Sequence, residues 1–375
     1  MIPLFKVHLP PKDELMPALE QVLYSGYITQ GPKVDRFEQK LSRVLKNRYV
    51  LAVNSGTSAL QLALRLSNVR GRDVVTTPMT CSATVLPVLA EGATPVWADI
   101  DPDSGNLDPA DVERKITPDT GAILAVHWGG QPCNMGWLSQ IARDHNIPLI
   151  VDAAHALGAS WNGEPVGSTD SGADFTCFSL QAIKHITTGD GGILTVKREA
   201  DYERGKRLRW FGLDRTANSG DARVDNDISE WGYKFHMNDI AATIGLAQLP
   251  YLTGILNMQR LNAAEYDEAL FLLPNVRRQK YLLGTVGAWW LYTVLLDSSA
   301  ERDAFMQFML SHGVQVSRVH SRLDRLSAFS GFSKGDLPGV SSFFERECAI
   351  PVHWGLSLEE VNQIISLVLE FCEAK

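Results

Sequence analysis

The chain has 375 residues, of which 45% are hydrophobic and 21% are charged, a balance typical of a globular protein rather than a disordered one. Its 43 acidic and 35 basic residues give a net charge of −8, which argues against binding to nucleic acid or to a membrane surface, because both need a basic face. The N-terminus lacks a signal-peptide core, no apolar run reaches the ~18 residues of a membrane helix, and the five cysteines are widely spaced, so we expect a soluble cytoplasmic protein with reduced thiols.

Two amphipathic helices are predicted first, over residues 10–26 and 34–45, from the helical spacing of their apolar residues. From residue 48 onward, short apolar runs alternate with helical segments. The runs are 48–53, 73–79, 94–100, 121–129, 147–158, 173–180 and 191–196. They are apolar on both faces, as buried parallel strands are, and their alternation with helices predicts an α/β fold with a mostly parallel sheet between helices. Ligands bind such sheets at the carboxyl ends of the strands.

The pattern changes after residue 250 and indicates a smaller α+β domain that ends in a helix from Leu358. We therefore expect a large domain over residues 1–250, which includes an N-terminal arm, and a small domain over residues 251–375.

The first motif at a strand end is Ser55-Gly56-Thr57, which lies between a predicted strand and a helix. The free N–H groups of a helix N-terminus, together with a hydroxyl, form a phosphate site. An ordinary helix cap is the alternative explanation, and the motif alone leaves it open.

The second motif is Asp152, which ends an apolar run, with His155 three residues later. Asp152 is either a functional carboxylate at a strand end or the cap of a helix that starts near Ala153.

The third motif is "FSLQAIKHITTGDGG", residues 178–192, in which Ser179 and Lys184 leave a strand and a glycine-rich turn leads to the next one. A lysine in an apolar pocket has a lowered pKa and can form a Schiff base. The alternative is a lysine whose ammonium reaches solvent from the core. Taken together, a phosphate site, a carboxylate and an amine at strand ends match the needs of pyridoxal phosphate, because the carboxylate keeps the pyridine nitrogen protonated while the lysine holds the aldehyde.

Nearly the whole chain also resembles the DegT/DnrJ/EryC1/StrS family of pyridoxal-phosphate-dependent sugar aminotransferases. The resemblance is carried by "SGYITQGPKVDRFE", "VNSGTSALQLAL", "EGATPVWADIDPDSGNLDP", "VDAAHALGA", "FSLQAIKHITTGDGG", "RWFGLDR" and "GYKFHMNDIAATIGLAQL". It implies the type I aminotransferase fold, a homodimer with a shared active site, and amination of a nucleotide-linked keto-sugar with glutamate as the donor. "DAAHALG", "AIKHIT" and "GYKFHMNDI" are most similar to the branch that aminates C4.

The resemblance also implies roles for single residues. Lys184 is the Schiff-base lysine and proton carrier, Asp152 pairs with the pyridine nitrogen, and His155 lies near the ring oxygen. Gly56, Thr57 and Ser179 hold the phosphate, and Lys234 or His236 of a partner subunit completes the phosphate site.

In "TPMTCSAT", Cys81 occupies the place where relatives commonly have an aromatic residue that stacks on the cofactor, so the residue that covers the ring stays open. Expected substrate contacts are Arg209, Arg215, His320 and Trp128. Trp128, together with Trp289 and Trp290 of "AWWLY", offers aromatic surface for a sugar or a base, and buried packing is the alternative for all three.

The sequence lacks the motifs of common metal-dependent and nicotinamide-dependent enzymes. The histidines form no H-x-x-x-H or H-E-x-x-H pattern, so we expect no metal site, and no G-x-G-x-x-G follows the first strand. Three alternatives stay open: amination at C3, a related sugar dehydratase that uses histidine in place of the lysine, and a non-catalytic regulator on the same fold. The presence of Lys184 argues against the dehydratase, and the complete residue set argues against the regulator.

Overall fold

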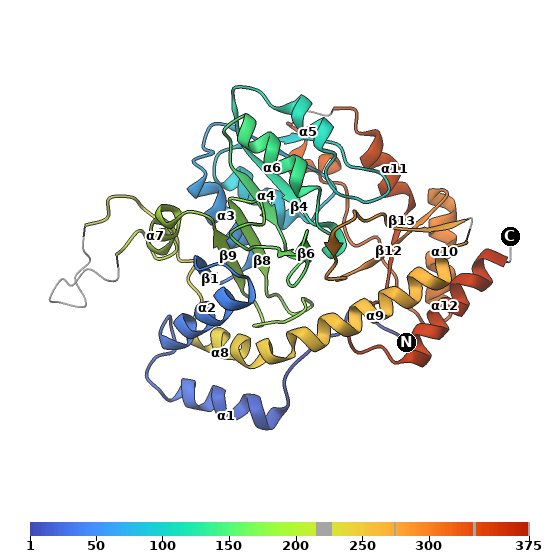
Figure 1. The fold of residues 1–375 in the computed structure, drawn as a ribbon, viewed down its shortest axis with the longest axis horizontal. Helices are drawn as coiled ribbons and strands as arrows, with labels where there is room; N and C mark the ends of the chain where they lie inside the picture. The colour runs from blue at the N-terminus through green and yellow to red at the C-terminus, as the bar shows by residue number, and fades with distance from the viewer. Residues whose placement is uncertain (215–226, 274, 333–334, 374–375) are drawn as a thin grey trace.

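A seven-stranded sheet forms the centre of the molecule in the computed structural model, which describes residues 1–214, 227–273, 275–332 and 335–373 (Figure 1). The strand order is β1-β9-β8-β5-β4-β2-β3. Neighbouring strands run parallel except at β9, which is antiparallel to both β1 and β8. The bounds are β1 Val50–Val53, β2 Asp73–Thr76, β3 Thr94–Trp97, β4 Thr120–Val126, β5 Leu149–Asp152, β8 Phe175–Ser179 and β9 Gly192–Val196. The predicted α/β fold with a mostly parallel sheet is confirmed.

Helices cover both faces of this sheet because its strands are apolar on both sides. Along β1, Val50 and Ala52 enter one core, whereas Leu51 and Val53 enter the other, as expected from the alternation of side chains along a strand. The helices are α1 Lys12–Leu23, α2 Pro32–Val44, α3 Gly56–Leu66, α4 Ser82–Ala90, α5 Pro109–Lys115, α6 Met135–Asp144, α7 Glu199–Leu208 and α8 Asp239–Gln248, with the 3₁₀ turns η1 Trp128–Gly130 and η2 Leu249–Tyr251. Residues of α2, α6 and α8 enter the first core, and residues of α3, α4 and α7 enter the second.

The long helix α9, Leu252–Leu270, leads from the large sheet to the C-terminal part, which has a separate core of its own (Figure 1). An antiparallel sheet of order β10-β12-β13 forms this part together with three helices. Its elements are β10 Val276–Arg278, β12 Tyr292–Leu296, β13 Glu347–Ile350, α10 Ser299–Ser311, α11 Pro338–Arg346 and α12 Leu358–Glu373, with the 3₁₀ turns η3 Leu323–Arg325 and η4 Ser327–Phe329. The expected closing helix from Leu358 is confirmed.

Two segments connect the parts across the expected boundary at residue 250. At the N-terminus, Ile2 forms a parallel bridge with Val314 and enters the C-terminal core. In the opposite direction, β11 Thr285–Val286 pairs with β6 Ser160–Trp161, which pairs with β7 Glu164–Pro165. The division at residue 250 stays a prediction.

The helical stretch from α8 through α9 corrects one expectation from the sequence. Residues Asp239–Leu270 are long and apolar enough to span a membrane by length and composition; their most apolar 18-residue window has a mean hydropathy of 1.2, and half of that window is buried inside the fold. Since α8 packs against α1 and α2, its apolar residues are explained by packing.

Candidate active site

A cavity of about 310 Å³ lies at the carboxyl ends of β1, β5 and β8. Most of the predicted site residues line it together: Gly56, Thr57, Cys81, Asp152, His155, Ser179, Lys184 and His320. Side chains more than 260 positions apart in the sequence therefore meet at the edge of the sheet where an α/β fold binds its ligand.

The N-terminus of α3 forms one wall of this cavity. Ser55 caps the helix, since its hydroxyl accepts a hydrogen bond from the Ser58 N–H. The cap and the phosphate interpretation are compatible, because Gly56 and Thr57, the first residues of the helix, line the cavity and the first N–H groups of a helix have no partner within the helix. A Cβ on Gly56 would lie only 2.9 Å from Cβ of Ser179, and one on Gly192 would lie 2.2 Å from the Ser55 carbonyl oxygen. These two glycines thus allow β8, β9 and the helix start to approach one another closely.

Asp152 ends β5 and is 5% exposed. Its carboxylate accepts hydrogen bonds from Thr84 Oγ1 at 2.7 Å and from the Ala154 N–H at 3.0 Å. No helix starts at Ala153, so the helix-cap alternative does not apply. Burial raises the pKa of Asp152, while the two hydrogen bonds and nearby Lys184 act in the opposite direction. The site therefore holds a desolvated carboxylate that a cationic ligand atom would stabilise.

Lys184 follows a buried stretch, although not all of its predecessors are buried. Phe178 and Leu180 are inaccessible, whereas Ala182 and Ile183 keep partial exposure. Lys184 itself is partly exposed toward the cavity, but the loss of water around its amino group lowers the pKa to about 7, against the opposing effect of Asp152. The amine is therefore neutral for part of the time near physiological pH, as a nucleophile and proton carrier requires.

Two histidines lie beside the lysine. The rings of His155 and His320 are 5.9 Å apart and nearly parallel. Burial, with a contribution from Lys184, lowers the pKa of His320 to about 4 and that of His155 well below its usual value. Both rings are therefore neutral at pH 7, and His155 Nδ1 is buried without a hydrogen-bond partner among the described residues.

Two predicted substrate contacts lie away from the cavity. Trp128 is inaccessible, and its indole N–H donates to Thr293 Oγ1 at 3.2 Å, so the packing alternative applies to it. Arg209 is 4% exposed; its guanidinium pairs with Glu38 and donates to the Ala52 carbonyl at 2.9 Å. The structure gives this cation a partner inside the fold instead of leaving it available for a diphosphate. Arg215 lies outside the described residues.

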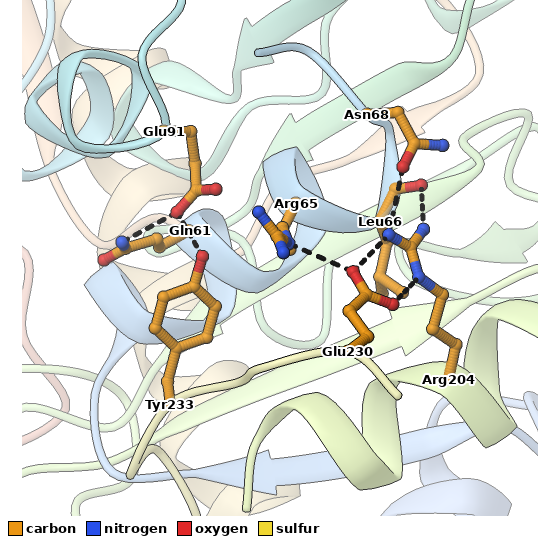
Figure 2. A network of polar contacts seen from close by, with 8 residues as sticks. All are labelled: Gln61, Arg65, Leu66, Asn68, Glu91, Arg204, Glu230 and Tyr233. Carbon is orange, nitrogen blue, oxygen red and sulfur yellow. Dashed lines mark hydrogen bonds and ion pairs between the residues drawn. The ribbon is translucent and has the colours of Figure 1, made fainter. Parts of the chain in front are cut away.

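Lys234 and His236 do not line the cavity of their own chain, and their role in a partner subunit stays a prediction. Lys234 is exposed, and the buried ring of His236 lies 3.6 Å from the Trp210 ring. Glu230 and Tyr233, which precede Lys234 in the sequence, are held in place by the polar contacts in Figure 2. There, Glu230 binds both Arg65 and Arg204, while Glu91 accepts hydrogen bonds from Gln61 and Tyr233.

Several cavity residues were not predicted as site residues: Thr84, Gln181, Asp190 and Trp290. Thr84 lies in the first turn of α4 and in the segment "TPMTCSAT" that contains Cys81. Trp290, predicted as aromatic surface or buried packing, lies next to the lysine, with Lys184 Nζ 3.5 Å from the centre of its ring.

Comparison with known proteins agrees with this geometry. The model of the DegT/DnrJ/EryC1/StrS aminotransferase family matches residues 11–369. The chain is 31% identical to the spore coat polysaccharide biosynthesis protein SpsC of Bacillus subtilis, over 95% of this chain and 94% of that protein. Its structure is similar to the sugar aminotransferase CalS13 from Micromonospora echinospora, with a TM-score of 0.92, 32% identity and coverage of 99% and 100% of the two chains. The putative sugar aminotransferase Spr1654 from Streptococcus pneumoniae, solved in a PLP form, has a TM-score of 0.88 and 29% identity over 98% of both chains.

Proposed function

The chain belongs to the DegT/DnrJ/EryC1/StrS aminotransferase family, and from this premise we propose that it transfers an amino group to a nucleotide-linked keto-sugar at C4. The observation that carries the proposal is the meeting of Lys184, Asp152 and the α3 N-terminus around one cavity. These are an amine with a lowered pKa, a buried carboxylate and an anion site. The fold is that of the type I aminotransferases, with the large mixed sheet and helices described above.

Pyridoxal phosphate, on which the enzymes of this family depend, fits the residues present. Asp152 is desolvated and short of a cation, His155 Nδ1 is a buried polar atom without a partner, and Gly56 leaves an open approach to Ser179. When bound, the cofactor supplies an aldehyde for amines and a ring that accepts electrons from the substrate carbon. Asp152 would hold its ring nitrogen, His155 its ring oxygen, and Gly56, Thr57 and Ser179 its phosphate.

The protein's own contribution to the transfer is to fix charges and move one proton. Lys184 would hold the cofactor through its aldehyde, and its Nζ is the group in the cavity that would carry the proton. Its pKa of about 7 allows Nζ both to accept and to return that proton near neutral pH. Asp152 keeps the negative charge that the ring nitrogen needs, and neutral His155 offers a hydrogen bond without adding a positive charge.

The finer points of the proposal are supported by the family motifs. Glutamate is proposed as the amino donor because the resemblance to the family implies it. C4 is proposed as the position of amination because "DAAHALG", "AIKHIT" and "GYKFHMNDI" are most similar to the branch of the family that aminates C4. We further propose a cytoplasmic homodimer in which Lys234 or His236 of one subunit completes the phosphate site of the other. The exposed position of Lys234 outside its own cavity supports this arrangement.

The test is direct amination. Purified protein loaded with pyridoxal phosphate should absorb visible light, lose that colour with glutamate, and aminate members of a panel of nucleotide-linked keto-sugars, with the new amine located by NMR. A protein that gains no colour with the cofactor would contradict the proposal as a whole. Colour that glutamate bleaches, with an amine at C3, would contradict only the position.

A further inference from the structure

The segment Ala288–Leu291 contacts the chain on both sides of Lys184, and its Trp290 lines the cavity. The Trp290 indole N–H donates to the Ile183 carbonyl at 2.9 Å, and His185 Nε2 lies 2.9 Å from the Ala288 carbonyl oxygen. The residue before the lysine and the residue after it are therefore both fixed to the same short segment. This arrangement leaves the lysine backbone little freedom to move.

The Trp290 ring also contacts the two side chains that flank it in the cavity. Lys184 Nζ lies 3.5 Å from the ring centre, and the His155 ring stacks on it at 3.7 Å with an angle of 18° between the planes. The tryptophan is 4% exposed. One rigid ring thus excludes water from the amine and fixes the plane of the imidazole.

The backbone is shaped to bring this segment to the site. Gly130 has φ of +94°, and a Cβ there would lie 2.5 Å from the His155 carbonyl oxygen and 2.9 Å from the Trp289 nitrogen. The Ala288 N–H donates to the Gly130 carbonyl at 3.0 Å, and Trp289 has φ of +52°, a conformation rare outside glycine. Such strain persists only where the surrounding contacts maintain it.

The N-terminal segment packs behind the tryptophan. Phe5 stacks on Trp290, with the ring centres 4.8 Å apart and an angle of 26° between the planes, and it packs against the small buried cluster that contains Trp290, Leu4 and Leu291. Ile2 ties this segment to Val314. The first residues of the chain therefore support a side chain that touches the lysine.

From these contacts we propose that Trp290, supported by Phe5, is a positioning residue that holds Lys184 and His155 in their reactive arrangement and keeps water away from the lysine amine. The inference rests on the proposed function, since it assigns Lys184 the role of nucleophile. Simple core packing is the competing explanation. It predicts that replacing Trp290 lowers the stability of the protein without changing the titration of Lys184.

The experiment follows the titration of Lys184 in protein freed of cofactor. Acetylation by a small reagent is measured by mass spectrometry across pH, with exposed Lys197 as the internal reference. The titratable groups that face Lys184 are Asp152, Cys81, His155, His185 and His320, and none of them is altered. In the Trp290→Ala variant, the pH midpoint of Lys184 acetylation should rise by about one pH unit, because water enters beside the amine. The Phe5→Ala variant should raise this midpoint by less. Trp290→Phe keeps an apolar ring and should leave the midpoint close to that of the wild type.

A second readout isolates the indole N–H. The Trp290→Phe variant loses the hydrogen bond to the Ile183 carbonyl. In this variant, the rate at which Lys184 attaches to pyridoxal phosphate, measured after fixing the bond with borohydride, should fall about fivefold. Unchanged midpoints in both Trp290→Ala and Phe5→Ala, with folding verified by circular dichroism, would overturn the proposal; if Trp290→Ala does not fold, Phe5→Ala and Trp290→Phe decide it alone. Because the midpoint is measured without cofactor, a wild-type protein that fails to bind pyridoxal phosphate contradicts the proposed function and not this inference.

Discussion

Thr84 Oγ1 donates a hydrogen bond to Asp152 Oδ2 across 2.7 Å, and both residues are almost fully buried. Thr80 Oγ1 lies 2.8 Å from the same threonine hydroxyl. The hydroxyl on α4 is thus one of the few groups that stabilise the charged form of a carboxylate which burial would otherwise neutralise. In this way α4 contributes a polar contact to the wall of the cavity.

Thr84→Val should weaken the binding of pyridoxal phosphate about tenfold, because a hydrogen bond to a charged group is lost at constant side-chain shape. Absorbance titration with the cofactor measures the change. Thr76→Val is the matched control, since Thr76 is also buried and its hydroxyl donates to the Leu124 carbonyl at 2.8 Å away from the cavity. Equal losses of affinity in the two variants would refute a specific role for Thr84.

Gly56→Ala should weaken the binding of pyridoxal phosphate while changing that of pyridoxal little. The added methyl would lie 2.9 Å from Ser179 Cβ, so the helix start and β8 must separate where the phosphate is expected. Calorimetric titration with both ligands measures the difference. Gly254→Ala on α9 meets no atom within 4 Å and should stabilise the protein by ~0.5–1 kcal/mol without affecting either ligand. If Gly56→Ala weakens both ligands equally, the phosphate assignment is wrong.

The fold and part of the site could be predicted because Asp152, Ser179 and Gly56 lie at the ends of three strands or just beyond them. Asp152 ends the apolar run of β5, Ser179 ends that of β8, and Gly56 opens the helix after β1. A polar residue directly after a buried run is a local signal, and the α/β fold then brings such ends together. This is why residues far apart in the chain could be assigned to one cavity from their sequence context alone.

The environments of Arg209, Trp128 and Trp290 could not be predicted because they depend on distant partners. Arg209 pairs with Glu38, 171 positions away, and Trp128 donates to Thr293, 165 positions away. Nothing near Arg209 in the sequence distinguishes a guanidinium that binds phosphate from one that is neutralised inside the fold. Trp290 likewise reaches Lys184 only through the packing of the C-terminal part against the large sheet.

Lys184→Met should stabilise the cofactor-free protein more at pH 6 than at pH 9. The pKa of Lys184 is lowered from 10.5 to about 7, so between these values the unfolded chain holds a proton that the folded chain lacks, and the stability of the wild type rises with pH. The penalty of the buried amine is complete below about pH 7 and fades toward pH 10.5. We expect a gain of at least about 1 kcal/mol at pH 6, measured by urea unfolding. A difference that stays constant across this range would contradict the lowered pKa.

Arg209→Met should destabilise the protein by about 3 kcal/mol, because the Glu38 carboxylate would remain largely buried without its cation. The KM for the sugar nucleotide should stay the same, since the guanidinium is bound to Glu38 and to the Ala52 carbonyl. Thermal unfolding and steady-state kinetics measure the two quantities. The double variant Glu38→Gln, Arg209→Met should recover part of the stability. A raised KM with unchanged stability would instead support the substrate contact expected from the sequence.

Mixing two inactive variants should restore activity if active sites are shared between subunits. Lys184→Ala removes the nucleophile from a subunit's own cavity, whereas Lys234→Ala combined with His236→Ala removes the groups proposed to serve the partner's cavity. In a heterodimer of the two, one site carries both defects and the other carries none. After unfolding and refolding equal amounts together, roughly one quarter of wild-type activity is expected, because half of the dimers are mixed and each has one intact site of two. Each variant refolded alone is the control and should stay inactive. Full activity of the Lys234→Ala, His236→Ala variant by itself would contradict the shared site, and so would mixtures that remain inactive although size-exclusion chromatography shows dimers.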